Sequence, residues 1–169
     1  MALLKSIEGK APQIGTDCFL AETAVIVGDV VLGDHSSVWY NAVIRGDVHY
    51  IKIGHSVNIQ DGAIIHCTYQ KSPVEIGDEV SIGHNAIIHG CTIEDRVLIG
   101  MGAIIMDNVV IKSGTLVAAG TLVPPGKVLE SGFVYAGNPA RPLKPLDPDD
   151  FKFFITRTAD NYKMYARWQ

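Results

Sequence analysis

Aliphatic residues recur every six positions along most of this chain. A period of six fits neither an amphipathic helix, with its period of about 3.6, nor a strand of simple alternation. It is typical of a solenoid, whose short units bury their aliphatic side chains only by stacking on neighbouring coils. Val and Ile dominate, as in strands, and Gly often follows, where we expect tight turns. The positions are Ile14, Leu20, Ile26, Leu32, Val38, Ile44, Ile53, Ile59, Ile65, Ile76, Ile82, Ile88, Ile93, Ile99, Ile105, Ile111, Val117 and Val123.

Two insertions interrupt this repeat. The step from Ile44 to Ile53 is three residues longer than a hexad, and the step from Ile65 to Ile76 is five residues longer. Insertions in a solenoid are expected to loop out at a corner, and such loops often carry the function. They therefore direct attention to the segment between them, residues 54–66.

The period resembles that of hexapeptide-repeat proteins, in which three hexads make one triangular coil of a left-handed parallel β-helix. Left-handedness is implied by this resemblance alone, because parallel crossovers are otherwise almost always right-handed. We predict an all-β single domain over residues 1–169, with the β-helix at 12–126, an exit segment at 127–146 and a C-terminal α-helix at 147–169. Asp147 and Pro148 are typical of a helix start. One apolar face should pack back along the coils, formed by Phe151, Phe154, Ile155, Thr158, Tyr162 and Tyr165.

Composition excludes several classes of function. The formal net charge is −4, and no basic cluster is visible, which argues against a nucleic-acid-binding surface. No apolar run approaches the length of a membrane span, and residues 1–10 do not read as a signal peptide. The three cysteines are odd in number and scattered, which fits a reducing compartment better than a disulfide framework. We therefore expect a cytoplasmic protein without a membrane or nucleic-acid partner.

Three histidines have a geometry that the repeat allows us to predict. His66 and His89 each follow an inward aliphatic residue, and they are separated by three hexads plus the five-residue insertion. They should therefore stack on adjacent coils, about 4.8 Å apart, and reach the same metal ion. His84 should point outward near another corner, so it would join them only across the interface of a symmetric trimer. The alternative for each is a solvated surface histidine.

Three imidazoles with a fourth position open are the pattern of a catalytic zinc site. Imidazole also suits iron and cobalt, so ligand type leaves the choice among Zn²⁺, Fe²⁺ and Co²⁺ open.

Several motifs together closely resemble those of the γ-class carbonic anhydrases. They are Arg45-Gly46-Asp47, Asn58-Ile59-Gln60-Asp61-Gly62 leading to His66, Gly83-His84-Asn85, and His89-Gly90. The resemblance implies a homotrimer with zinc at each subunit interface, held by His66 and His89 of one subunit and His84 of the next. It also implies reversible hydration of CO₂ to bicarbonate by metal-bound hydroxide.

The resemblance assigns roles to further residues. Gln60 matches an active-site glutamine that orients the nucleophile or bicarbonate. Arg45, Asp47 and Asp61 match positions that pair across or beside the interface, and a purely structural role is an equal alternative for all three. Tyr162, with its neighbour Asn161, corresponds to residues near the metal, although a tyrosine at helical spacing also serves packing.

The chain departs from the founding archaeal enzymes of this class, which carry proton-shuttling glutamates. Val48 stands at the first of these positions, and the loop after His66 holds no acid before Glu75. Two alternatives therefore stay open. One is an acyltransferase or acyl-CoA thioesterase built on the same fold. The other is a non-catalytic metal-binding or scaffold member of the family.

Overall fold

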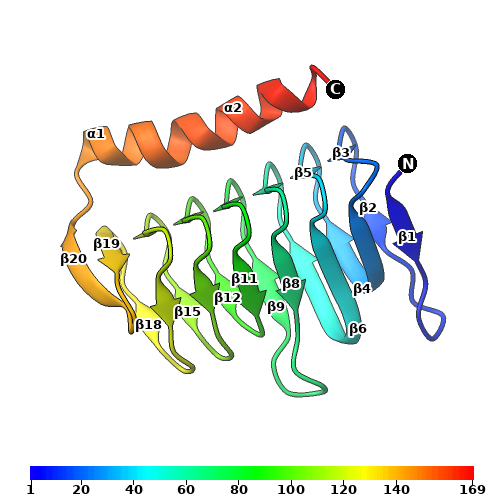
Figure 1. The fold of residues 1–169 in the computed structure, drawn as a ribbon, viewed down its shortest axis with the longest axis horizontal. Coiled ribbons are helices and arrows are strands. Elements are labelled where there is room, and N and C mark those ends of the chain that lie inside the picture. Colours follow the sequence, from blue (N-terminus) through cyan, green and yellow to red (C-terminus); the bar gives the residue numbers. More distant parts are fainter.

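The computed structural model describes all 169 residues, which form a parallel β-solenoid flanked by one C-terminal helical segment (Figure 1). The strands of the solenoid stack into three faces, and each pairs in parallel with its counterparts one coil away. The coiling agrees with a left-handed β-helix, as the resemblance to hexapeptide-repeat proteins implies. The first face holds β1 (Leu3–Lys5), β8 (Ile64–His66), β11 (Ile87–His89), β14 (Ile104–Ile105) and β17 (Leu122–Val123).

The second and third faces complete the solenoid. The second holds β2 (Gln13–Ile14), β9 (Val74–Ile76), β12 (Thr92–Ile93), β15 (Val110–Ile111) and β18 (Val128–Leu129). The third holds β3 (Phe19–Leu20), β5 (Ser37–Val38), β7 (Asn58–Ile59), β10 (Ser81–Ile82), β13 (Leu98–Ile99), β16 (Leu116–Val117) and β19 (Phe133–Ala136). Two long strands, β4 (Val25–Leu32) and β6 (Val43–Ile53), pass from the first face to the second.

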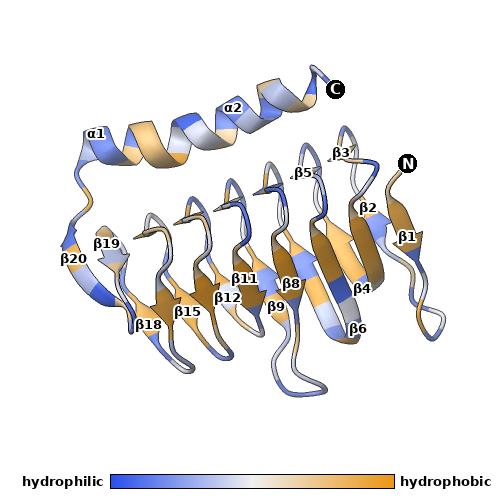
Figure 2. Ribbon diagram, in the orientation of Figure 1, coloured by the Kyte–Doolittle hydropathy of each residue, from blue (hydrophilic) through white to orange (hydrophobic).

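The core is the column of inward aliphatic side chains that the six-residue period predicts. Figure 2 shows the strands mainly in the hydrophobic colour and the turns between them in paler or hydrophilic colours. Each coil stacks directly on the next, so the inward side chains form one continuous column along the molecule. The largest fully buried side chains are Ile26, Leu32, Ile44, Ile51, Ile59, Ile65, Ile82, Ile88, Ile93, Ile99, Ile105 and Ile111.

The prediction that both insertions loop out at a corner is wrong for the first of them. Arg45 and Gly46 pair with β4, and the residues up to Tyr50 stay within β6. Between Gly46 and Ile51, β6 has four residues where β4 has one, so the insertion is accommodated as a bulge at the corner and not as a separate loop. The second insertion does project as a loop between β8 and β9 (Figure 1), closed by a Thr68–Ser72 bridge.

The solenoid also continues beyond the predicted end at residue 126. Strand β18 pairs with β15 and strand β19 pairs with β16, both in parallel, so the coil persists through Ala136. Leu129 and Tyr135 continue the six-residue count from Val123, and they are buried at 4% and 7% exposure. Only then does β20 (Arg141–Pro145) turn back antiparallel to β19.

The glycines after the aliphatic residues have a different cause from the one predicted. The turn conformation is supplied instead by residues such as Asn85, which has a φ of 56°. A Cβ on Gly33 would lie 2.5 Å from the carbonyl oxygen of Gly54, and a Cβ on Gly83 would lie 2.7 Å from that of Ile99. These glycines are therefore required because backbones of successive coils approach closely, not because the chain turns there.

The C-terminal segment is helical as predicted and lies back along the outside of the solenoid (Figure 1). It comprises α1 (Pro148–Asp150), a π-helical turn at Phe151–Thr156 and α2 (Arg157–Ala166). The Asp147 side chain caps it by accepting a hydrogen bond from the Asp150 N–H at 2.8 Å. Ile155 and Ala159 are buried, and the Tyr162 ring packs edge-on against Trp39. No helix is long and apolar enough to cross a membrane.

Candidate metal centre

His66 and His89 are brought together as the sequence predicts. They are register partners on the adjacent strands β8 and β11, so their side chains leave the first face at the same level. The Nδ1 atom of His66 lies 3.2 Å from the Nε2 atom of His89, and both rings are partly buried. The repeat and the five-residue insertion therefore place two imidazole nitrogens beside each other.

A carboxylate faces the other nitrogen of each ring. Asp47 Oδ1 lies 3.1 Å from His66 Nε2, and Asp107 Oδ2 lies 3.2 Å from His89 Nδ1. A carboxylate accepts a hydrogen bond, so it places the ring proton on the nitrogen that faces it. The two inner nitrogens, His66 Nδ1 and His89 Nε2, are then left with their lone pairs.

This arrangement fits a bound cation. Two lone pairs that face each other at 3.2 Å repel unless a proton or a metal cation lies between them. Two nitrogens bound to one tetrahedral zinc ion at about 2.1 Å would be separated by about 3.4 Å, close to what is observed. Within a single chain, no group of three or more His, Cys, Asp or Glu residues is placed to hold a metal. The pair on the first face thus provides two donors.

Asp107 was missed by the sequence reasoning, although a signal for it exists. It follows the inward Ile105 by two residues, and Ile105 is the register partner of Ile88. Met106 therefore corresponds to His89 on the next coil, and Asp107 is the residue directly after it.

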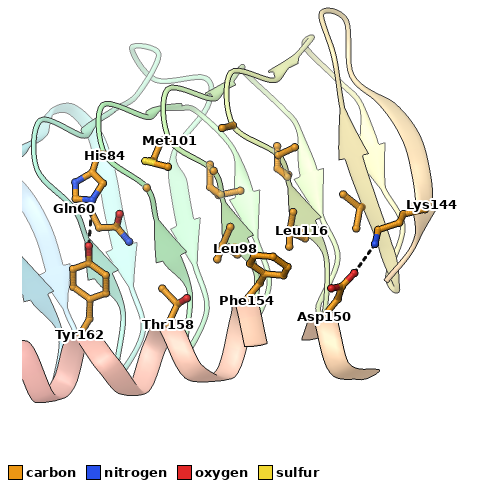
Figure 3. Close-up of a pocket in the computed structure, with 17 residues that line it drawn as sticks. Gln60, His84, Leu98, Met101, Leu116, Lys144, Asp150, Phe154, Thr158 and Tyr162 are labelled. Carbon is orange, nitrogen blue, oxygen red and sulfur yellow. Dashed lines mark hydrogen bonds and ion pairs between the residues drawn. The ribbon is translucent and has the colours of Figure 1, made fainter. Parts of the chain in front are cut away.

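His84 lies apart from this pair, at the corner between the third and first faces. Its Nδ1 atom is 2.8 Å from Asp61 Oδ2, and its Nε2 atom is 3.4 Å from the Tyr162 hydroxyl. Figure 3 shows His84 pointing toward Tyr162 on the C-terminal helix. Burial raises the pKa of Tyr162 to about 12, so its hydroxyl keeps its proton near neutral pH. Like His66 and His89, His84 has a carboxylate against one of its ring nitrogens, but it lies on a different surface of the subunit.

Gln60 is held beside His84 by a row of buried polar side chains. Its Nε2 donates to Asn58 Oδ1 at 3.0 Å, and Asn58 Nδ2 donates to Ser81 Oγ at 2.7 Å on the next coil. Gln60 is 6% exposed and lines the same groove as His84 and Tyr162 (Figure 3). Its amide is thus fixed by neighbours and presented at one end of that groove.

Arg45 and Asp47 form an ion pair beside His66. Burial alone would raise the pKa of Asp47, but hydrogen bonds from Arg45 and His66 outweigh it, and the pKa is lowered overall. The pKa of His66 is also lowered, mainly because burial disfavours the imidazolium. His66 is therefore held as a neutral imidazole, the form that binds metals.

An apolar stripe runs along the first face beside His66 and His89. Its members are outward-facing aliphatic residues that are register partners from coil to coil, namely Val25, Val43, Ile64, Ile87, Ile104 and Leu122. Ile64 is 43% exposed and Ile87 is 37% exposed. A contiguous row of exposed aliphatic side chains is typical of an interaction surface.

A groove of about 660 Å³ extends from His84 along the third face, beneath the C-terminal helix. Leu98, Leu116 and Phe154 supply apolar walls, and the Lys144–Asp150 ion pair closes the far end (Figure 3). The groove and the apolar stripe lie on either side of the corner that carries His84.

Comparison with known proteins places the chain among hexapeptide-repeat proteins. The family model described as "Bacterial transferase hexapeptide (six repeats)" matches residues 11–46 and 90–125. A solved structure, a putative acetyltransferase from Bacillus cereus, superposes with a TM-score of 0.93 at 36% identity and covers 99% of both chains.

Curated relatives define the family within that class. The chain is 43% identical over 145 residues to a carbonic anhydrase of Geobacillus kaustophilus, covering 86% of this chain and 79% of the relative. It is 42% identical over 169 residues to the mitochondrial gamma carbonic anhydrase 1 of Arabidopsis thaliana, covering 97% of this chain but only 61% of that longer relative. The chain belongs to the γ-class carbonic anhydrase-like family of hexapeptide-repeat proteins.

Proposed function

We propose that this protein is a metal-dependent carbonic anhydrase that interconverts CO₂ and bicarbonate at sites shared between the subunits of a homotrimer. The observation that carries the proposal is the pairing of His66 and His89 at 3.2 Å, each backed by a carboxylate. The same carboxylate support at His84, on a separate surface, favours His84 of a second copy as the third ligand. Zinc is the proposed metal, and when bound it would lower the pKa of a coordinated water.

The other residues near the site would orient substrate and ligands. The amide of Gln60, fixed by Asn58, would hold the substrate oxygen near the ligands by a hydrogen bond. Asp47, Asp61 and Asp107 would fix the ring orientation and tautomer of the three histidines, as carboxylates do behind metal-bound imidazole. Arg45 would keep Asp47 ionised for that task.

The trimer is supported by the apolar stripe and by the separation of the ligands. A cyclic assembly brings one surface of each subunit against a different surface of the next, which matches two donors on one surface and one on another. The stripe beside His66 and His89 would supply the buried centre of this contact, where aliphatic residues are favoured over charges.

Stopped-flow measurement of CO₂ hydration on zinc-loaded protein tests the proposed function. We expect catalysis above the buffer rate in wild-type protein and its loss in His66→Ala, with circular dichroism confirming that the variant folds. A matched control is His55→Ala, since His55 lies at a different corner. No hydration by wild-type protein carrying a full complement of metal would refute the proposal.

A second candidate is transfer or hydrolysis of an acyl group carried by a coenzyme A thioester. One observation favours it, namely the largely apolar groove that ends at Gln60 and His84. A panel of acyl-CoA substrates of increasing chain length, monitored by thiol release with and without an acceptor, separates the two functions. Thiol release without CO₂ hydration would favour this second candidate.

A further inference from the structure

The loop inserted after His66 reaches across two coils to Asp107. The hydroxyl of Thr68 donates to Asp107 Oδ1 at 2.6 Å, although the two residues are 39 positions apart. Both oxygens of that carboxylate face His89 Nδ1, Oδ1 at 3.3 Å and Oδ2 at 3.2 Å. A continuous hydrogen-bonded path therefore runs from the loop through Asp107 to His89.

The loop is tied down at further points, so Thr68 is not free to move. Thr68 and Ser72 exchange backbone hydrogen bonds, and the Ser72 hydroxyl contacts Asn108 Oδ1 at 3.1 Å. Ser72 is only 3% exposed. Gly90 leaves the room for this contact, because a Cβ there would lie 2.7 Å from the Cβ of Ser72 and would also collide with the Asp107 carboxylate. The insertion and Gly90 together fix the position of Asp107.

We infer that Thr68 and Asp107 are a positioning pair that keeps the proton of His89 on Nδ1 and aims its Nε2 lone pair at the metal position. Thr68 holds the Asp107 carboxylate with both oxygens against His89 Nδ1, which fixes both the rotamer of Asp107 and the ring plane of His89. The extra residues between Ile65 and Ile76 then have a specific purpose, which is to carry a hydroxyl to a carboxylate on a distant coil. The part of this inference that concerns metal rests on the proposed function.

Zinc affinity tests the positioning pair. The protein is stripped with a chelator and titrated with Zn²⁺ in competition with a chromophoric chelator. We expect Asp107→Ala to weaken binding about 10- to 100-fold, the range seen when such outer partners are removed. Asp107→Asn, which keeps an oxygen acceptor but loses the charge, should fall between Asp107→Ala and wild type. Thr68→Val, which keeps the side-chain shape, should weaken binding less than Asp107→Ala does.

The matched control is Glu94→Gln. Glu94 also accepts a hydrogen bond from a hydroxyl of the next coil, Ser113, but contacts no histidine. Its replacement should leave zinc affinity unchanged. Wild-type affinity in a folded Asp107→Ala protein would overturn the inference.

A second readout needs no metal. Long-range ¹H–¹⁵N correlation spectra of the stripped protein report which ring nitrogen of His89 carries the proton. We expect Nδ1–H in wild type and in Glu94→Gln, and a mixture of tautomers in Asp107→Ala and, to a smaller extent, in Thr68→Val. An unchanged tautomer in both variants would overturn the positioning pair. Failure of the wild-type protein to bind zinc, together with the expected tautomers, would overturn the proposed function and leave the pair standing.

Discussion

Ile64 and Ile87 are register partners on adjacent strands, and both remain more than a third exposed at 43% and 37%. The neighbouring inward residues, Ile65 and Ile88, are fully buried. One step along the strand thus separates the core of the subunit from the surface proposed to join subunits.

Charges placed on the apolar stripe should dissociate the trimer. We expect the double variant Ile64→Asp, Ile87→Asp to be monomeric by light scattering at concentrations where wild-type protein is trimeric, because the contact would bury unpaired carboxylates. Circular dichroism should be unchanged. Val128→Asp is the control, since Val128 is 49% exposed but lies on the second face. A double variant that stays trimeric would remove the stripe from the interface.

Truncation of a core residue should destabilise the coil itself. Ile88 is fully buried, so Ile88→Ala leaves a cavity and should lower the free energy of unfolding by about 2–5 kcal/mol. The exposed control Val128→Ala should change it by no more than about 0.5 kcal/mol. Urea unfolding followed by circular dichroism measures both, and equal effects would contradict the burial of Ile88.

The cysteines should differ in reactivity. Burial raises the pKa of Cys67 to about 11 and raises that of Cys91 further, so neither forms the reactive thiolate near neutral pH. Cys18 is only half-buried. Ellman's reagent should therefore label Cys18 alone in native protein, should label nothing in native Cys18→Ser, and should label every cysteine in denaturant. Rapid native labelling of Cys67 would refute its assignment as a buried structural residue.

Glu94 should contribute to stability in a pH-dependent way. Hydrogen bonds from Lys112 and from the Ser113 N–H lower its pKa below the ordinary value of about 4.3. Because the folded pKa is the lower one, the contribution is present above the ordinary pKa and is lost as pH falls through the folded pKa. Carboxyl NMR titration should show the lowered value in wild type and its return toward the ordinary value in Lys112→Ala.

The stability effect of this pair should be small. The side chains of Glu94 and Lys112 are 36% and 39% exposed, so water screens the interaction, which we place below about 1 kcal/mol. Glu94→Gln should therefore differ slightly from wild type at neutral pH, and the difference should vanish in acid. A difference that grows on acidification would contradict the sign of the pKa shift.

The sequence predicts the features that follow from counting. A six-residue period specifies the inward column from Ile14 to Val123, and the same count places His66 and His89 side by side and His84 elsewhere. The helix start at Asp147 follows from local capping chemistry. These features depend on short-range spacing, which is why they are visible without a structure.

Features that depend on backbone contacts and loop geometry between coils were not predicted. The residues after Gly46 form a bulge in β6 against β4. Gly33 and Gly83 are required because the backbone of the next coil lies close to them. Counting to the coil after His89 would have located Asp107, but not the hydrogen bond that it accepts from Thr68. Such relations join residues many positions apart and leave no local pattern.

The central claim, a metal site completed between subunits, is tested most directly by mixing two inactive variants. His84→Ala keeps the first-face pair, and His66→Ala keeps the third ligand, so neither alone should bind zinc tightly or hydrate CO₂. Subunit exchange in an equimolar mixture should restore about one quarter of the wild-type sites. At about one interface in four, a His84→Ala subunit supplies the intact His66–His89 pair and a His66→Ala subunit supplies the intact His84. Recovery of zinc binding at that level, together with activity, is the predicted result. Tight zinc binding by His84→Ala alone, or no recovery after confirmed exchange, would contradict the account.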